Sequence, residues 1–118
     1  SAAEAGAALD QLADAVGAPA LGYFAEGSLE TDLRDGPLTA PMLARALANR
    51  IPEGGIISDD GVTTSHFAFA AATYAAPHDW MCLTGGALGQ GAPVAIGASI
   101  AAPDRKVICL SGDGALLY

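Results

Sequence analysis

The chain has 118 residues with 5 basic and 13 acidic side chains, so its formal net charge is −8. This length suits one small domain, and the acidic balance argues against a nucleic-acid partner, because phosphates need a basic face. No apolar run reaches the ~18 residues of a membrane span, and the start lacks the basic and apolar stretches of a signal peptide. We therefore expect no membrane partner and a cytoplasmic protein.

The first third of the chain differs from the rest. An apolar stripe at helical spacing predicts a helix over residues 2–16. Residues 20–37 show no period and are rich in glycine and in charges of both signs, which is typical of a linker. We expect residues 1–37 to be the end of a preceding domain with its linker, and residues 38–118 to be the N-terminal half of a second domain.

From residue 38 onward, helical and strand patterns alternate. We expect helices over 40–50, 62–74 and 92–102, and strands over 56–59, 80–84 and 106–111. Continuous apolar strands that alternate with helices predict an α/β fold, a parallel sheet with helices on both faces. Three short strands leave open edges, and the last residue falls about one turn after a strand. We therefore expect an incomplete fold, part of a larger protein.

Several polar and sulfur side chains carry weaker signals. Cys82 and Cys109 sit in apolar runs, so we expect two buried free thiols. Asp59 and Asp60 are adjacent in a strand and therefore point to opposite faces, so we expect them to cap the next helix rather than form an acid–base pair. His66 lies early in that helix, where we expect a surface or packed histidine.

Three junctions between strand and helix are candidate ligand sites, because ligands of such sheets bind where strands end. The Gly112-Asp113-Gly114 turn allows close approach to an anion, and its carboxylate suits magnesium. The plain alternative is a tight turn with an aspartate cap. The glycine-rich loop of residues 85–91 suits backbone contact with a flat ring or, alternatively, close packing. It matches neither a dinucleotide fingerprint nor a P-loop.

Three segments together resemble a known family. They are TGGALGQGAPVAIGA over residues 84–98, PDRKVI over residues 103–108, and the Gly-Asp-Gly turn. In this order and spacing they look like the first half of the diphosphate-binding domain of thiamine diphosphate enzymes, especially the acetolactate synthase and benzoylformate decarboxylase group. The resemblance covers about residues 38–118 and implies an incomplete thiamine diphosphate-binding fold.

The resemblance also implies site residues. The positions that match cofactor-binding residues of the family are Val62, Thr63, Gly86, Leu88, Gly112, Asp113, Gly114 and Ala115. Asp113 would be a magnesium ligand, and the Gly86 carbonyl would accept a hydrogen bond from the aminopyrimidine. Leu88 would hold the cofactor in its bent form. Ala115 stands where the family usually has a serine, which removes one hydrogen bond to a phosphate.

The implied function is that of a thiamine diphosphate- and magnesium-dependent enzyme that acts on 2-keto acids, by acetolactate synthase-like decarboxylation and carboligation. A benzoylformate-type non-oxidative decarboxylase stays open, as does a non-catalytic binding or assembly module with the same fold. The parent enzyme is expected to be a homodimer or homotetramer. FAD is compatible with the parent enzyme, although no residue of this chain supports it.

No catalytic residue is assigned to this chain. In the family, the glutamate that activates the cofactor lies in a separate domain, and the second metal ligand is an asparagine further downstream. Neither is found in this sequence, and Glu26 and Glu30 are not candidates for the glutamate. We therefore expect the chain to be inactive by itself.

Overall fold

The computed structural model describes residues 2–18 and 36–118. The first element, α1, spans Ala2–Ala15, as its apolar period predicts. Its stripe is not covered, however, because Leu9, Leu12 and Val16 are all more than half exposed. Most of the expected linker, together with Glu26 and Glu30, lies outside the described residues.

A parallel sheet of three strands forms the centre of the fold. The strands are β1 (Gly55–Asp60), β2 (His78–Cys82) and β3 (Val107–Ser111), and their order in the sheet is β2-β1-β3. The register places Asp59 opposite Cys82 and Asp60 opposite Ser111. The last residues of β1 therefore lie between the ends of both neighbouring strands.

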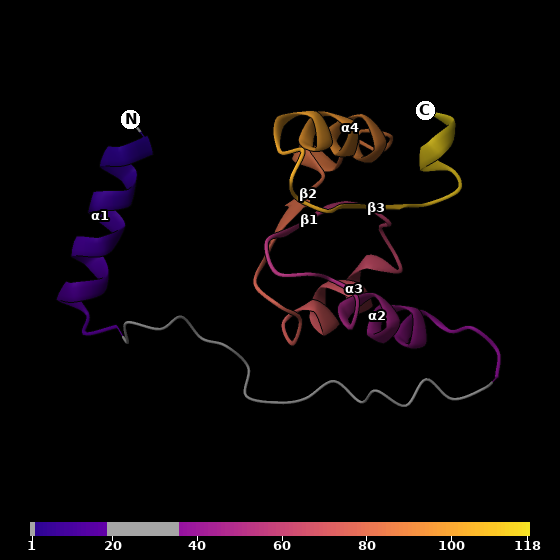
Figure 1. Ribbon diagram of the computed structural model, residues 1–118, viewed down its shortest axis with the longest axis horizontal. Helices are drawn as coiled ribbons and strands as arrows, with labels where there is room; N and C mark the ends of the chain where they lie inside the picture. The colour runs from indigo at the N-terminus through magenta and orange to yellow at the C-terminus, as the bar shows by residue number, and fades with distance from the viewer. Residues whose placement is uncertain (1, 19–35) are drawn as a thin grey trace.

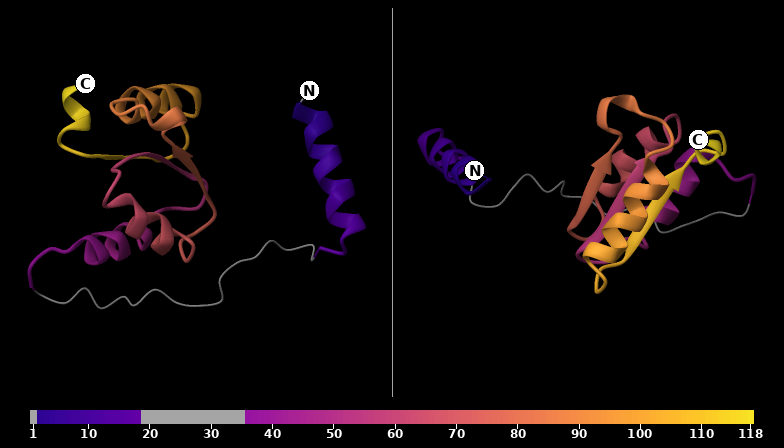
Figure 2. Two further views of the ribbon diagram at one scale, coloured as in Figure 1. Left: turned by 180° about the vertical axis from the view of Figure 1, so that it is seen from behind. Right: turned by 90° about the horizontal axis from the view of Figure 1, so that it is seen from above.

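Helices cover both faces of this sheet. Figure 1 shows α2 (Ala40–Ala48) and α3 (Ser65–Ala72) on one face and α4 (Gly91–Ala101) on the other. Two short 3-10 turns, η1 (Thr84–Gly86) and η2 (Ala115–Leu117), follow β2 and β3. The predicted α/β architecture is thus confirmed, and Figure 2 shows α4 running along the strands in the view from above. Among the described helices, none combines the length and the apolar character that crossing a membrane requires.

The core lies between the sheet and the pair of helices α2 and α3. Ile57, at the centre of β1, is completely buried and packs with Ile51 and Ala72. Full burial of one such side chain contributes about 1.5–3 kcal/mol. Thr39 caps α2, as its side chain accepts a hydrogen bond from the Met42 amide at 3.4 Å.

Two elements start two or three residues away from the expected position. The helix expected from residue 62 begins at Ser65, because Val62 adopts a left-handed φ of 43° that a helix cannot contain. The strand expected over residues 80–84 begins instead at His78, which pairs with Gly55, and ends at Cys82.

The expectation of buried thiols was wrong. Both cysteines are free, as expected, but both are exposed. Cys82 and Cys109 lie on β2 and β3, which are the edge strands of the sheet. An apolar run identifies a strand without telling whether neighbours cover it, which is why the thiols were placed wrongly.

Candidate functional site

The three turns singled out in the sequence lie at the same edge of the sheet, beyond the carboxyl ends of the parallel strands. The chain leaves β1 toward α3 on one face, and leaves β2 toward α4 on the other. With the order β2-β1-β3, the topological switch point falls between β1 and β3. Ligands of such sheets bind at this crevice, which here lies between the turn at Val62 and the Gly112-Asp113-Gly114 turn.

The turn after β1 has a strained backbone. Val62 is the one non-glycine residue with positive φ among the described residues, and its side chain is 52% exposed. A β-branched residue in this conformation costs about 1–3 kcal/mol and is most common at functional sites. In the described part of the chain, the amides of Val62 and Thr63 donate no hydrogen bond, so they are available to a ligand.

Asp59 holds this turn in place. Its Oδ1 accepts hydrogen bonds from the Gly61 amide, at 3.0 Å, and from the Ser65 hydroxyl. Its Oδ2 accepts one from Trp80 Nε1 at 3.1 Å. The carboxylate therefore binds the turn and the first residue of α3, and does not cap free amides of the first helical turn as expected.

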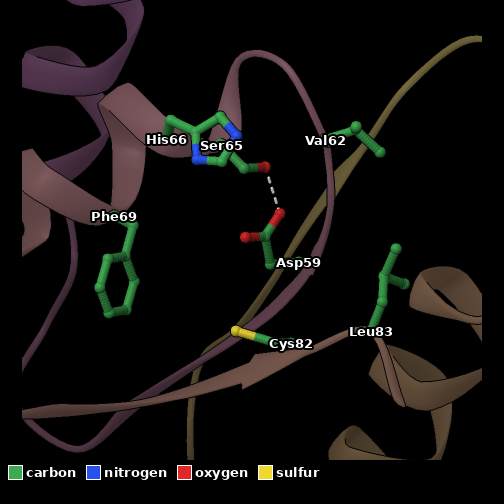
Figure 3. Close-up of a pocket in the computed structure, with 7 residues that line it drawn as sticks. All are labelled: Asp59, Val62, Ser65, His66, Phe69, Cys82 and Leu83. Atoms are coloured by element: carbon green, nitrogen blue, oxygen red, sulfur yellow. Dashed lines mark hydrogen bonds between the residues drawn. The ribbon is translucent and has the colours of Figure 1, made fainter. Parts of the chain in front are cut away.

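A pocket of about 380 Å³ opens beside this turn (Figure 3). It is lined by Asp59, Val62, Ser65, His66, Phe69, Cys82 and Leu83. The Phe69 ring stands edge-on to Trp80, with centroids 5.4 Å apart, so the wall of the pocket is continuous with the aromatic packing of β2. Leu83 and Phe69 were not predicted as site residues. The available signals were that Leu83 directly follows β2 and that Phe69 lies on the exposed side of α3.

The glycine-rich loop follows β2. Gly85 and Gly86 have φ values of 64° and 70°, which L-residues rarely adopt, and a Cβ at either position would meet no atom within 4 Å. Leu88, two residues after Gly86, is 47% exposed. A Cβ added at Gly89 would collide with the side chain of Tyr118. The loop therefore leaves Gly86 and Leu88 accessible and closely approaches η2.

Asp60 connects the loop to the rest of the site. Its side chain is 1% exposed, and Oδ2 accepts hydrogen bonds from the amides of Gly89 at 2.8 Å and Gly91 at 3.2 Å. Its main-chain carbonyl accepts a hydrogen bond from the Gly112 amide at 3.2 Å. The sequence did not predict this role, and the one available signal is an acidic residue at the end of a buried strand.

The Gly112-Asp113-Gly114 turn is, in contrast, open. Asp113 is exposed, and its carboxylate makes no hydrogen bond or ion pair with the described residues. The amides of Asp113, Gly114 and Ala115 also donate none within this part of the chain. A free carboxylate beside free amides fits a cation and an anion bound together.

The donors for a metal ion are few. No group of three or more histidine, cysteine, aspartate or glutamate side chains is placed to hold a metal among residues 2–18 and 36–118. Magnesium usually takes one or two carboxylates together with phosphate oxygens and waters, so Asp113 fits as one of several ligands. Ala115 is buried and has no hydroxyl to add to the site.

The comparisons with known proteins agree with this geometry. Residues 59–118 match the family model described as "Thiamine pyrophosphate enzyme, C-terminal TPP binding domain". The chain is 41% identical over 118 residues to "Putative acetolactate synthase large subunit IlvX" of Mycobacterium tuberculosis, covering 98% of this chain and 23% of that protein. It is 40% identical over 84 residues to "Acetolactate synthase isozyme 1 large subunit" of Escherichia coli, covering 69% and 15%.

A third relative is named for a different activity. It is "Alpha-keto-acid decarboxylase" of Mycobacterium ulcerans, 34% identical over 98 residues, with 77% of this chain and 16% of the relative covered. The chain thus spans less than a quarter of the length of the curated relatives it matches. No solved structure matches it. Since the family model covers the segment from the end of β1 through all three turns, the chain belongs to the thiamine pyrophosphate enzyme family, through its C-terminal TPP-binding domain.

Proposed function

We propose that this chain supplies one side of a thiamine diphosphate–magnesium site in an enzyme that decarboxylates a 2-keto acid and joins the product to a second carbonyl compound, as an acetolactate synthase does. The observation that carries this proposal is the placement of unengaged groups at the switch point of a sheet from this family. The Asp113 carboxylate and the amides of Val62, Thr63 and residues 113–115 make no hydrogen bond in the described structure.

Each turn has a role in this proposal. Asp113 ligates magnesium, and the amides of Val62, Thr63 and residues 113–115 donate hydrogen bonds to the diphosphate. The Gly86 carbonyl accepts a hydrogen bond from the aminopyrimidine, and Leu88 supports the bent cofactor. When bound, thiamine diphosphate supplies the nucleophilic carbon and the electron sink for loss of carbon dioxide.

The remaining parts of the reaction lie outside these residues. We propose that the glutamate that activates the cofactor and the asparagine that completes the metal site belong to other segments of the enzyme, and that the enzyme is a homodimer or homotetramer. Residues 1–37 would then be the end of a preceding domain and its linker, and residues 38–118 the first half of the cofactor domain. These 118 residues would show no activity alone.

Simple decarboxylation is the second candidate. The relative named as an α-keto-acid decarboxylase favours it, and a benzoylformate-type enzyme would share the same cofactor site. A non-catalytic module that keeps the fold is the third candidate, because Ala115 cannot make the hydrogen bond of the family's serine.

Product analysis separates these candidates. The full-length protein is incubated with thiamine diphosphate, magnesium and either pyruvate or benzoylformate. We expect acetolactate and carbon dioxide from two molecules of pyruvate. Acetaldehyde from pyruvate or benzaldehyde from benzoylformate would instead show a simple decarboxylase. If the cofactor binds but neither 2-keto acid is consumed, the activity proposed here is wrong.

A further inference from the structure

We propose that Asp60 is a positioning residue for the cofactor site, because its buried carboxylate fixes the glycine-rich loop in the shape that receives the ring end of thiamine diphosphate. The inference rests on the proposed function only for the identity of the ligand. The hydrogen bonds that define Asp60's role join residues of this chain.

Two turns that lie far apart in the sequence meet at Asp60. Oδ2 of Asp60 binds the amides of Gly89 and Gly91, which lie 29 and 31 positions later in the chain. The carbonyl of the same residue binds the amide of Gly112, at the start of the turn after β3. The last residue of the central strand therefore holds both neighbouring turns, with its side chain on one and its main chain on the other.

The glycine-rich loop closely surrounds the Asp60 carboxylate. Gly91 is buried, and a Cβ at this position would collide with the Asp60 side chain. Gly89 has a φ of 93°, so its amide is presented by a backbone that only glycine adopts easily. Glycine is therefore needed at position 91 because the Asp60 side chain is so close, and at position 89 because of its φ and the nearby Tyr118. The loop of residues 85–91 is built around these close approaches.

Burial of the Asp60 carboxylate is favourable at one oxygen and unfavourable at the other. Its second oxygen, Oδ1, is buried and accepts no hydrogen bond from the described residues. An unmade hydrogen bond of this kind is unfavourable. The carboxylate lies at the amino end of α4, where an anion is favourable, and its Oδ2 engages the Gly91 amide there.

Amide hydrogen exchange at Gly89 and Gly91, measured by NMR on the full-length protein, tests the proposal without the cofactor. We expect Asp60→Ala to accelerate exchange at both amides at least about tenfold, because a lost hydrogen bond of about 1.4 kcal/mol corresponds to that factor. Asp60→Asn keeps an acceptor oxygen and should stay within about threefold of the parent. Asp104→Ala, at an exposed acid, should change nothing.

A second pair of variants keeps the test valid if Asp60→Ala does not fold. Gly91→Ala should loosen the loop from the other side, because the added methyl group displaces the Asp60 side chain. Alanine is a better helix former than glycine, so a loosened loop would not be explained by helix propensity. Gly97→Ala, in the same helix, has open space around the added methyl and should leave exchange at Gly89 unchanged. If Gly91→Ala and Gly97→Ala give the same exchange at Gly89, or a folded Asp60→Ala exchanges like the parent, the proposal is wrong.

The link to the cofactor has a separate readout. Calorimetry with thiamine diphosphate and magnesium should show at least about tenfold weaker binding for Asp60→Ala and Gly91→Ala, with rescue in Asp60→Asn. If the parent protein binds no thiamine diphosphate, the proposed function fails, while the exchange data still decide whether Asp60 holds the loop. Normal cofactor affinity in a variant with a loosened loop would overturn the positioning role.

Discussion

The glycine-rich loop and the Gly112-Asp113-Gly114 turn resemble each other in sequence but differ in how the protein holds them. The loop is tied internally, through the Asp60 carboxylate and the contact of Gly89 with Tyr118. The turn is bound to β1 only through the Gly112 amide, while the Asp113 carboxylate and the amides of residues 113–115 make no hydrogen bond with a described residue. Glycine-rich segments therefore serve two purposes here, since one is shaped by the protein and the other is left open for a ligand.

This comparison predicts that the open turn carries the metal. Asp113→Ala should weaken magnesium-dependent binding of thiamine diphosphate by about 100-fold or more, since even groups that only orient a metal ligand are worth 10–100-fold. Thermal unfolding of the free protein should be unchanged, because the carboxylate has no partner in the described structure. Asp104→Ala is the matched control, and equal binding by both variants would contradict the assignment of Asp113.

A glycine-to-alanine substitution should change stability strongly in the loop and hardly at all in the turn. Gly89→Ala should destabilise the protein by at least about 2 kcal/mol, because φ is 93° and the new methyl meets Tyr118. Gly114→Ala should change stability by less than about 0.5 kcal/mol, because φ is −65° and the space is open. Thermal or urea unfolding measures both, and a stable Gly89→Ala variant would remove the difference between the two segments.

Leu88 allows a test of function within the loop itself. Its side chain is 47% exposed, so Leu88→Ala should cost little stability, about 0.5 kcal/mol or less. If Leu88 supports the bent cofactor, turnover of the 2-keto acid should fall about tenfold or more while magnesium affinity stays the same. Ile100→Ala, at an exposed residue near the carboxyl end of α4, is the control. Unchanged turnover would remove Leu88 from the site.

Ala115 should give a smaller effect in the favourable direction. Ala115→Ser adds the hydroxyl that the family usually has, and one hydrogen bond to a phosphate is worth roughly 1 kcal/mol, or about fivefold in affinity. Calorimetry should therefore show tighter binding of thiamine diphosphate. Weaker binding would mean that the buried position of Ala115 cannot accept the hydroxyl.

The smallest expected effect concerns Cys109. The Cys109 side chain is exposed, but partial burial of its sulfur is the largest cause that raises the pKa of the thiol, followed by the charges of Asp60 and Asp59. Alkylation by iodoacetamide, followed against pH in a Cys82→Ser protein, should reach half its maximal rate above the pH usual for a thiol. Asp60→Asn should lower this midpoint without restoring the usual value, because burial is the larger cause. A midpoint that does not move in Asp60→Asn would show that this charge does not reach Cys109.

The same raised pKa affects stability with a definite sign. The folded protein holds the thiol proton more tightly than the unfolded chain does, so the contribution to stability is complete below the ordinary pKa of a thiol. It is lost as the pH rises through the raised value. Neutral pH lies below both pKa values, so a change of pH there should not alter the free energy of unfolding through this thiol.

The sequence predicted the order of helices and strands because their apolar periods are local properties of the chain. It also predicted the family, because the motifs after β2 and β3 stand at a characteristic spacing. It did not predict Asp60's contacts with Gly89 and Gly91, since these residues meet only after α3 and β2 have formed. Exposure of Cys82 and Cys109 likewise depends on which strands lie at the edges of the sheet. The cofactor roles of the turn residues stay predictions.

The most direct test of the account is a calorimetric titration of the full-length protein with thiamine diphosphate, in magnesium and again in EDTA. We expect saturable binding with magnesium that is lost in EDTA, because Asp113 and the metal hold the diphosphate at the switch point between β1 and β3. Absence of binding in both titrations, or binding of equal strength in both, would contradict the claim that the Gly112-Asp113-Gly114 turn is one side of a thiamine diphosphate–magnesium site.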